Sequence, residues 1–267
     1  MNDEIHAILQ TGRLGDLWFT VPLADRLASL GHQVEVWYDE IYGDPFVYFP
    51  SVIARPAKLA RVVPGSGRAA RLANAAAQQL LLYARLRRLG RRVVWNQVYP
   101  FRLLAAYRSK QPYPYSWYRR YPGLDFRRAH STLPLADDGT ILYFAASASL
   151  RIGAASPFAP WLEANLELLE TRTGYRVLYV PPPGEPDHPR FPTWRGDLDA
   201  YQRLIARCGL VFGISTSAHV LAQLLGKPVV ACYADRRRIV DTIGGETAKL
   251  YPGELLDAAA LARFGRD

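Results

Sequence analysis

The chain has 267 residues, of which 49% are hydrophobic and 21% charged, and its 20 glycines and 20 prolines are spread along its length. This composition is that of a folded protein with one large or two smaller domains, and it excludes the disordered, collagen-like and repeat classes. The two cysteines cannot build a disulfide framework, and neither lies in a Cys-x-x-Cys or Cys/His cluster, so we expect no structural zinc. The acidic start is unlike a signal peptide and no apolar run approaches the ~18 residues of a transmembrane segment, so we expect a soluble, cytoplasmic protein.

The net charge of +9 is unevenly distributed. A turn-like Asp137-Asp138-Gly139 follows residue 136, and we place a boundary there between a domain at 1–136 and a domain at 137–267. The first domain carries 19 Lys and Arg against 9 Asp and Glu, whereas the second carries 14 against 15. Residues 45–128 hold 17 basic residues and a single acid. We therefore expect the first domain to bind a polyanion. A genome rich in arginine codons is the alternative explanation, but the second domain shares that genome and is neutral.

In chain order, the first half starts with an α/β pattern. Residues 5–9 form an apolar strand, which is followed by a glycine loop, a helix through Leu30 and a second strand at 33–37. This order predicts a parallel sheet that binds ligands at the carboxyl ends of its strands.

The rest of the first half is less regular. Residues 68–89 have a helical period, which predicts a helix with its apolar face in the core. The apolar positions are Leu72, Ala76, Leu80, Tyr83, Leu86 and Leu89. Residues 95–128 mix aromatic and basic side chains with prolines, which predicts irregular loops.

The second half repeats strand and helix. We expect strands at 141–145, 176–180, 210–213 and 229–232, with helices at 160–173, 199–208 and 217–225. Two α/β halves of similar size predict a ligand cleft between them.

A hydroxyl-rich turn joins the strand at 210–213 to its helix. Ser215, Thr216 and Ser217 stand where free backbone N–H groups and the helix dipole favour a phosphate, and their hydroxyls can add donors. His219 lies early in this helix and can reach the same anion or its sugar. In isolation, these residues would be a helix cap and a packed histidine.

Two segments resemble motifs of the heptosyltransferase-like glycosyltransferases, glycosyltransferase family 9. In this family a strand, an Asp-Ser/Thr-Gly-x-x-His turn, a helix and a Gly-x-Pro strand bind the nucleotide diphosphate. The matching residues are Ser215, His219, Gly226 and Pro228, while Ile214 and Thr216 stand in place of Asp and Gly. Gly15 to Pro22 resembles the N-terminal motif of the family, a Gly-Asp pair followed by an apolar stretch, a Thr and a Pro.

On this resemblance, Asp16 is the general base. A carboxylate at the mouth of the first strand can take the proton of an acceptor hydroxyl as it attacks a sugar carbon. The helix dipole alone would also favour an acid here. The presence of both motifs in the proper order favours the catalytic role.

The resemblance covers residues 5–38 and 139–232, and it implies the GT-B fold, two Rossmann-like domains that face a central cleft. It also implies a nucleotide-diphosphate sugar donor on the C-terminal domain, an acceptor on the N-terminal domain, and neither a metal nor another bound cofactor. The expected donor contacts are Gly15, Arg151, Ser215, Thr216, Ser217 and His219. Arg151 stands near the place of a family lysine and can bind phosphate through two hydrogen bonds.

The acceptor must offer a hydroxyl on a polyanion. Duplex DNA offers one on a hydroxymethylated pyrimidine, which must be flipped out and held by aromatic or arginine planes. The expected acceptor contacts are Arg13, Arg102, Arg108, Trp117, Tyr118, Arg119 and Arg120. The density of basic residues favours such DNA over the alternative acceptor, a phosphorylated lipopolysaccharide core.

Two other classes remain open, a nucleotide-sugar epimerase and a non-catalytic DNA-binding module. A dinucleotide dehydrogenase is disfavoured because Gly12 and Gly15 lack the Gly-x-Gly-x-x-Gly spacing.

Overall fold

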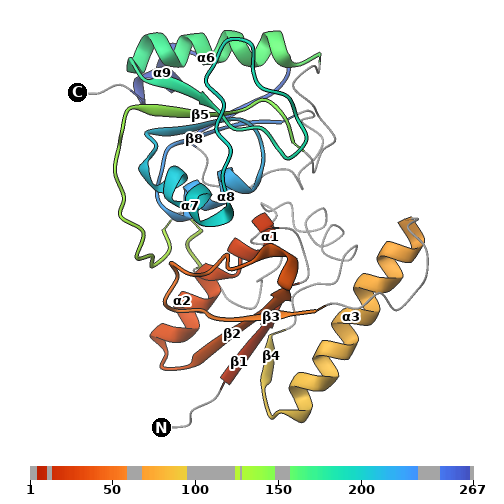
Figure 1. The fold of residues 1–267 in the computed structure, drawn as a ribbon. Helices are drawn as coiled ribbons and strands as arrows, with labels where there is room; N and C mark the ends of the chain where they lie inside the picture. The colour runs from red at the N-terminus through yellow and green to blue at the C-terminus, as the bar shows by residue number, and fades with distance from the viewer. Residues whose placement is uncertain are drawn as a thin grey trace. The chain divides into compact units, whose positions relative to one another are not determined.

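A computed structural model describes residues 5–10, 14–58, 68–94, 124–126, 128–147, 157–233 and 247–264, with only the backbone at 68–72, 75 and 76. The chain divides into two compact units, Met1–Thr132 and Leu133–Asp267 (Figure 1). Each unit holds one parallel β-sheet.

The N-terminal unit has a sheet with the strand order β3-β2-β1-β4. Its elements are β1 (Ile5–Leu9), α1 (Leu14–Trp18), α2 (Val21–Ser29), β2 (Gln33–Asp39), the 3-10 helix η1 (Glu40–Tyr42), β3 (Ile53–Ala57), α3 (Arg68–Arg88) and β4 (Arg92–Val94). The chain runs from β1 outward to β2 and β3 and then crosses to β4 on the other side. The topological switch point of this doubly wound sheet therefore lies between β1 and β4.

The single helix expected after β1 is in fact two helices. The Thr20 hydroxyl donates to the Leu17 carbonyl oxygen at 2.6 Å and the Thr20 N–H donates to the same oxygen at 2.9 Å, which closes α1. Pro22 then stands in the first turn of α2, where a missing N–H costs nothing. The motif residues Thr20 and Pro22 thus have a local structural role. Gly31, at φ 84°, follows the end of α2 as expected.

A buried carboxylate joins the strands of this unit. Glu35 in β2 accepts hydrogen bonds from Arg55 in β3 at 2.9 and 3.0 Å, from Arg91 at 3.2 Å and from the Trp37 indole at 3.2 Å. Burial alone would raise the pKa of Glu35, but these hydrogen bonds and positive charges outweigh it, so the pKa is lowered and the group is ionised.

Helix α3 confirms the expected helix, but the expected core face is wrong. Leu82 and Leu86 are buried in a cluster with Trp37 of β2, whereas Leu80 is 59% exposed and Leu89 is 52% exposed. The helix carries leucines on two sides, and the buried side also includes the polar Gln79. Hydrophobic periodicity alone could not identify the side that meets the sheet.

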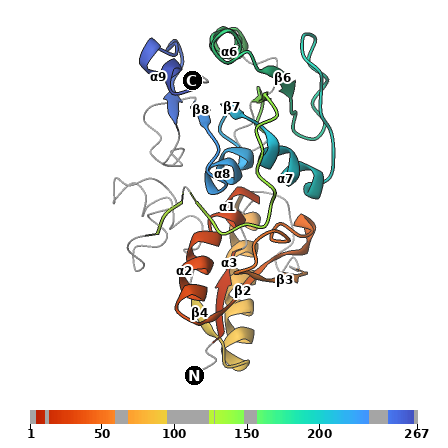
Figure 2. The same ribbon diagram turned by 90° about the vertical axis from the view of Figure 1, so that its left-hand side faces the viewer.

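The C-terminal unit is a three-layer α/β structure with the strand order β6-β5-β7-β8-β9. Its elements are β5 (Thr140–Phe144), α6 (Ala159–Thr173), β6 (Arg176–Tyr179), α7 (Leu198–Arg207), β7 (Leu210–Ile214), α8 (Ser217–Leu224), β8 (Val229–Cys232), β9 (Ala248–Leu250) and α9 (Ala258–Ala262). Helices α6 and α9 cover one face of the sheet, and α7 and α8 cover the other (Figures 1 and 2). Every element expected in this half is confirmed to within one residue at each end.

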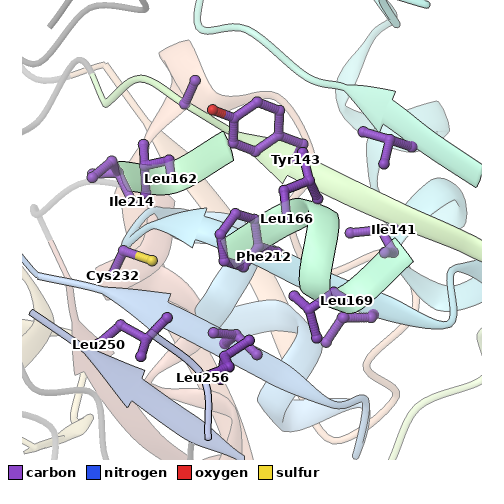
Figure 3. Close-up of a cluster of buried hydrophobic side chains, with 14 of the residues drawn as sticks. Ile141, Tyr143, Leu162, Leu166, Leu169, Phe212, Ile214, Cys232, Leu250 and Leu256 are labelled. Carbon is purple, nitrogen blue, oxygen red and sulfur yellow. The ribbon is translucent and has the colours of Figure 1, made fainter. Parts of the chain in front are cut away.

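The core of this unit lies between the sheet and α6 (Figure 3). Leu162, Leu166 and Leu169 recur at helical spacing and are fully buried against β5 and β7, to which Tyr143 and Phe212 belong. The rings of Tyr143 and Phe212 stack at 5.8 Å between centroids.

A buried asparagine attaches the last part of this unit to α6. The Asn165 amide donates to the Glu254 carbonyl oxygen at 3.0 Å and accepts from the Leu256 N–H at 2.8 Å. The Trp161 indole donates to the same Glu254 oxygen at 2.6 Å. Residues 254–256 are therefore fixed on α6 by polar contacts as well as by packing.

Among the described residues, no helix combines the length and the hydrophobicity needed to cross a bilayer.

Candidate functional site

The strand order of the C-terminal unit identifies where a ligand would bind. β6 lies on one side of β5, while β7, β8 and β9 follow on the other, so the topological switch point lies between β5 and β7. Ligands of such sheets bind outside the carboxyl ends of the strands at this point. The turn at 215–217 directly follows β7, and Ala145 to Ser147 directly follow β5. The turn expected to bind the donor is therefore at the switch point.

Close packing of β5 and β7 requires a glycine beside this turn. Gly213 has φ 127°, and a Cβ there would lie 2.2 Å from the Phe144 carbonyl oxygen. One residue beyond β7, the Ser215 N–H donates to the Cys232 carbonyl oxygen at 3.3 Å. The start of the turn is thus held by the strands on either side of β7.

The turn itself is a capping box. Thr216 is the N-cap of α8, and its hydroxyl accepts from the Ala218 N–H at 3.3 Å. The Thr216 N–H in turn donates to Nδ1 of His219 at 3.1 Å. A histidine thus fills the position that Glu or Gln usually holds in this motif.

His219 is neutral and has no contact with solvent. Its side chain is fully buried, and burial lowers its pKa to about 4. Because Nδ1 accepts a hydrogen bond, the proton of the neutral ring is on Nε2. The sequence predicts direct contact between His219 and the donor. In the structure the imidazole is instead covered, so we expect it to hold the turn in place.

An aromatic residue at this turn, and a second one that packs against it, were not predicted. Burial raises the pKa of Tyr201 in α7 to about 12, against the effect of hydrogen bonds with Ser217, Thr216 and the Ala218 backbone. Its phenol oxygen therefore lies at the first turn of α8. The Trp194 ring packs 6.1 Å from the Tyr201 ring, between centroids. The helical period places Tyr201 one turn from buried Ile205, but no sequence signal shows that α7 and α8 are neighbours.

In the N-terminal unit, Asp16 follows the strand at the switch point. It is the third residue of α1 and is 9% exposed. The Gln10 amide, one residue beyond β1, donates to the Asp16 carbonyl oxygen at 3.0 Å. Gly15, the second residue of α1, accepts from the Phe19 N–H at 3.3 Å. The backbone of Asp16 is therefore held close to the carboxyl end of β1. The role of Asp16 as a base remains a prediction.

Several expected contact residues lie outside the described residues. These are Arg151 of the expected donor site and Arg13, Arg102, Arg108, Trp117, Tyr118, Arg119 and Arg120 of the expected acceptor site. Asp16 and the Ser215 turn belong to different units, and the cleft expected between the units remains a prediction. Within the part of the chain that the structure describes, no three His, Cys, Asp or Glu side chains are grouped so that they could hold a metal ion.

Comparison with solved structures shows that this chain has the GT-B fold of heptosyltransferase-like glycosyltransferases. Its two parallel, doubly wound units agree with that fold. The E. coli heptosyltransferase WaaC with ADP is similar over 97% of this chain and 98% of that chain, with a TM-score of 0.60 and 18% identity. A glycosyl transferase family 9 protein from Veillonella parvula is similar over 94% of this chain and 87% of that chain, with a TM-score of 0.58 and 13% identity.

A third similar structure is that of the E. coli ADP-heptose lps heptosyltransferase II. It matches over 98% of this chain and 95% of that chain, with a TM-score of 0.54 and 12% identity. No family model matches the sequence, and the search of curated proteins finds no match. At these identities the similarity concerns the fold.

Proposed function

We propose that this protein is a glycosyltransferase that moves a sugar from a nucleotide diphosphate to a hydroxyl of a phosphorylated lipopolysaccharide core. The observation that carries the proposal is the position of the hydroxyl-rich turn, Ser215 to Ser217, at the switch point of a GT-B unit. In such a unit the start of α8 presents the positive end of the helix dipole to an anion, with the Ser215 and Ser217 hydroxyls beside it.

The reaction needs one base and one stabilised leaving group. Asp16 takes the proton of the acceptor hydroxyl as its oxygen forms a bond with the anomeric carbon of the donor. The bond from that carbon to the diphosphate breaks, and the negative charge on the diphosphate oxygens is stabilised by α8 and by the Ser215 and Ser217 hydroxyls. This chemistry requires no metal ion, and Arg151 is the proposed additional positive charge.

The comparisons favour a lipopolysaccharide acceptor over the DNA acceptor that the charge distribution suggests. WaaC is a heptosyltransferase with ADP in its structure, and the other E. coli relative is named for ADP-heptose and lipopolysaccharide. Nothing among the similar structures supports hydroxymethylated DNA. A phosphorylated core is also a polyanion, so it accounts for the sign of the charge on the N-terminal unit.

The proposal is tested by incubating the protein with ADP-heptose and a panel of other nucleotide sugars. Each donor is combined either with a phosphorylated core oligosaccharide or with duplex DNA that contains 5-hydroxymethylcytosine, and products are identified by mass. We expect transfer to the oligosaccharide, with unchanged rate in EDTA. Transfer to DNA alone would replace the acceptor proposal, and isomerisation of a donor without an acceptor would indicate an epimerase.

The donor site has a test of its own. Calorimetry should show weaker ADP binding by the Ser215→Ala, Ser217→Ala double variant, because each lost hydrogen bond to a charged group costs about 1.5–3 kcal/mol. Ser29→Ala is the matched control, since its hydroxyl donates only to the Arg26 carbonyl oxygen at 2.7 Å in α2. Equal ADP affinity in all three proteins would place the donor elsewhere.

A further inference from the structure

The solvent side of α3 is an apolar stripe. Ala77, Leu80, Leu81 and Ala84 follow the i, i+3, i+4, i+7 spacing of one helix face. Leu80 is 59% exposed and Leu81 is 62% exposed. The buried Leu82 lies on the opposite side of the helix, against the sheet. The exposed leucines are therefore not part of the core of this unit, and within the described residues α3 packs mainly against β1 and β4.

The same helix is strongly basic. Its 21 residues include five arginines and no acid. Arg87 and Arg88 are exposed at its C-terminal end. Glu35 is a buried carboxylate of the neighbouring strand β2, and it is already bound by Arg55 and Arg91. The end of α3 thus has a positive charge beside exposed leucines.

The exposed leucines and the arginines of α3 together distinguish between possible partners. A second copy of the chain would bring the arginines of two α3 helices together, which is unfavourable. A nucleic acid backbone would suit the arginines but would leave Leu80 and Leu81 without an apolar environment. The surface of a bilayer with anionic lipids satisfies both, since leucines enter the acyl boundary while arginines extend to the headgroups.

We propose that α3 is a membrane-docking helix, which binds the surface of anionic bilayers through Leu80 and Leu81 and through Arg87 and Arg88. The proposal does not depend on the proposed transferase activity. It also differs from a transmembrane anchor, because the helix lies in the interface plane.

The test is flotation of the full chain with two kinds of vesicle. One consists of neutral phosphatidylcholine, and the other also contains about 30% of the anionic lipid phosphatidylglycerol, which attracts basic side chains. We expect binding to the anionic vesicles at low salt. Leu80→Gln, Leu81→Gln should lower the partition coefficient by roughly tenfold or more. Arg87→Gln, Arg88→Gln should lower it about 30-fold at low salt, since each arginine contributes about fivefold near such a surface.

Two exposed leucines elsewhere provide matched controls. Leu30 is 56% exposed and Leu255 is 58% exposed. Leu30→Gln and Leu255→Gln should float like the unchanged protein, and all variants should keep the same thermal unfolding midpoint. ADP affinity should also be unaffected by the α3 changes, which separates this test from that of the transferase.

Three results would overturn the inference. One is the failure of the unchanged protein to float with anionic vesicles at low salt. Another is undiminished flotation of both α3 double variants. The third is a dimer in solution that dissociates when Leu80 and Leu81 are changed, because a second copy would then be the occupant of this face.

Discussion

In the N-terminal unit the helix after the switch-point strand contains an acid, Asp16, whereas in the C-terminal unit the helix after the corresponding strand starts with hydroxyls. The two sheets are both parallel and doubly wound, so the difference lies in the residues that follow these two strands. A carboxylate can accept a proton, while the start of α8 can bind an anion. The comparison teaches that one architecture, used twice, can supply both a proton acceptor and an anion site, the two opposite requirements of the proposed sugar transfer.

The largest expected effect concerns Asp16 in α1. Asp16→Asn should lower turnover by about 10²–10⁴-fold, because the proposed general base is lost. Donor affinity should be unchanged, since the turn proposed to bind the donor belongs to the other unit. Steady-state kinetics and calorimetry measure the two quantities. Asp39→Asn is the control, a carboxylate at the end of β2 in the same sheet that accepts from the Ile41 N–H at 3.2 Å. Near-normal turnover in Asp16→Asn would show that α1 does not supply the base.

The next largest effect is expected at Gly213, which lies beside the turn at 215–217. Gly213→Ala should lower the free energy of unfolding by about 3 kcal/mol or more, because it combines an unfavourable φ with a contact of 2.2 Å to the Phe144 carbonyl oxygen. Gly174→Ala, at φ 67° with open space around it, should cost only about 1 kcal/mol. Urea unfolding measures both. Equal costs would show that the approach of β5 to β7 does not constrain the turn.

The pH dependence of the free energy of unfolding tests whether His219 is buried as a neutral ring. Burial lowers its pKa from 6.5 to about 4 in the folded protein, so the unfolded chain binds the extra proton between these values. The contribution of His219 to the free energy of unfolding is therefore fully present above pH 6.5. It falls by about 3 kcal/mol as the pH decreases toward 4. His188, whose pKa is also lowered by burial, contributes in the same direction.

The matched variant is His219→Gln, which can keep the capping box but does not titrate. Its unfolding free energy should vary less with pH between 6.5 and 4 than that of the unchanged protein. Its ADP affinity should stay within a few-fold of the original value. A large loss of affinity would show that the imidazole contacts the donor directly, as the sequence motif predicts.

The smallest effect concerns the N-cap. Thr216→Val removes the hydroxyl that accepts from the Ala218 N–H and should cost about 1 kcal/mol of stability. Thr132→Val is a suitable comparison, since its hydroxyl donates only weakly, at 3.4 Å, to the Tyr48 carbonyl oxygen. Thermal unfolding distinguishes them, and an equal midpoint for both variants would mean that the cap does not stabilise α8.

The sequence predicted the C-terminal unit almost completely because its parallel strands are buried on both faces and are therefore continuous apolar runs. β7, β8 and the turn between β7 and α8 are local features of this kind. The strands β3, β4 and β9 were missed, since β4 and β9 have only three residues each and β3 contains no continuous apolar run. β3 also contains Pro56, which argues against a strand when the partner is unknown.

Contacts between elements distant in sequence account for the other errors. The sequence misassigned the buried face of α3, because both sides of the helix carry leucines and only the packing of Leu82 and Leu86 distinguishes them. Tyr201 and Trp194 were missed for a related reason, since their relevance depends on α7 lying beside α8. The location of the turn at 215–217 was predictable because capping and strand ends are encoded within a few residues. Its role in donor binding stays a prediction.

The attachment of residues 254–256 to α6 has a consequence for synthesis on the ribosome. Asn165 is made 89 residues before Glu254 and 91 before Leu256, the partners of its buried amide. Until these partners leave the exit tunnel, the Asn165 amide must be solvated by water, so α6 cannot bury it against the sheet. The C-terminal unit therefore completes its core late in translation, and a nascent chain stalled before residue 254 should remain sensitive to proteases at α6.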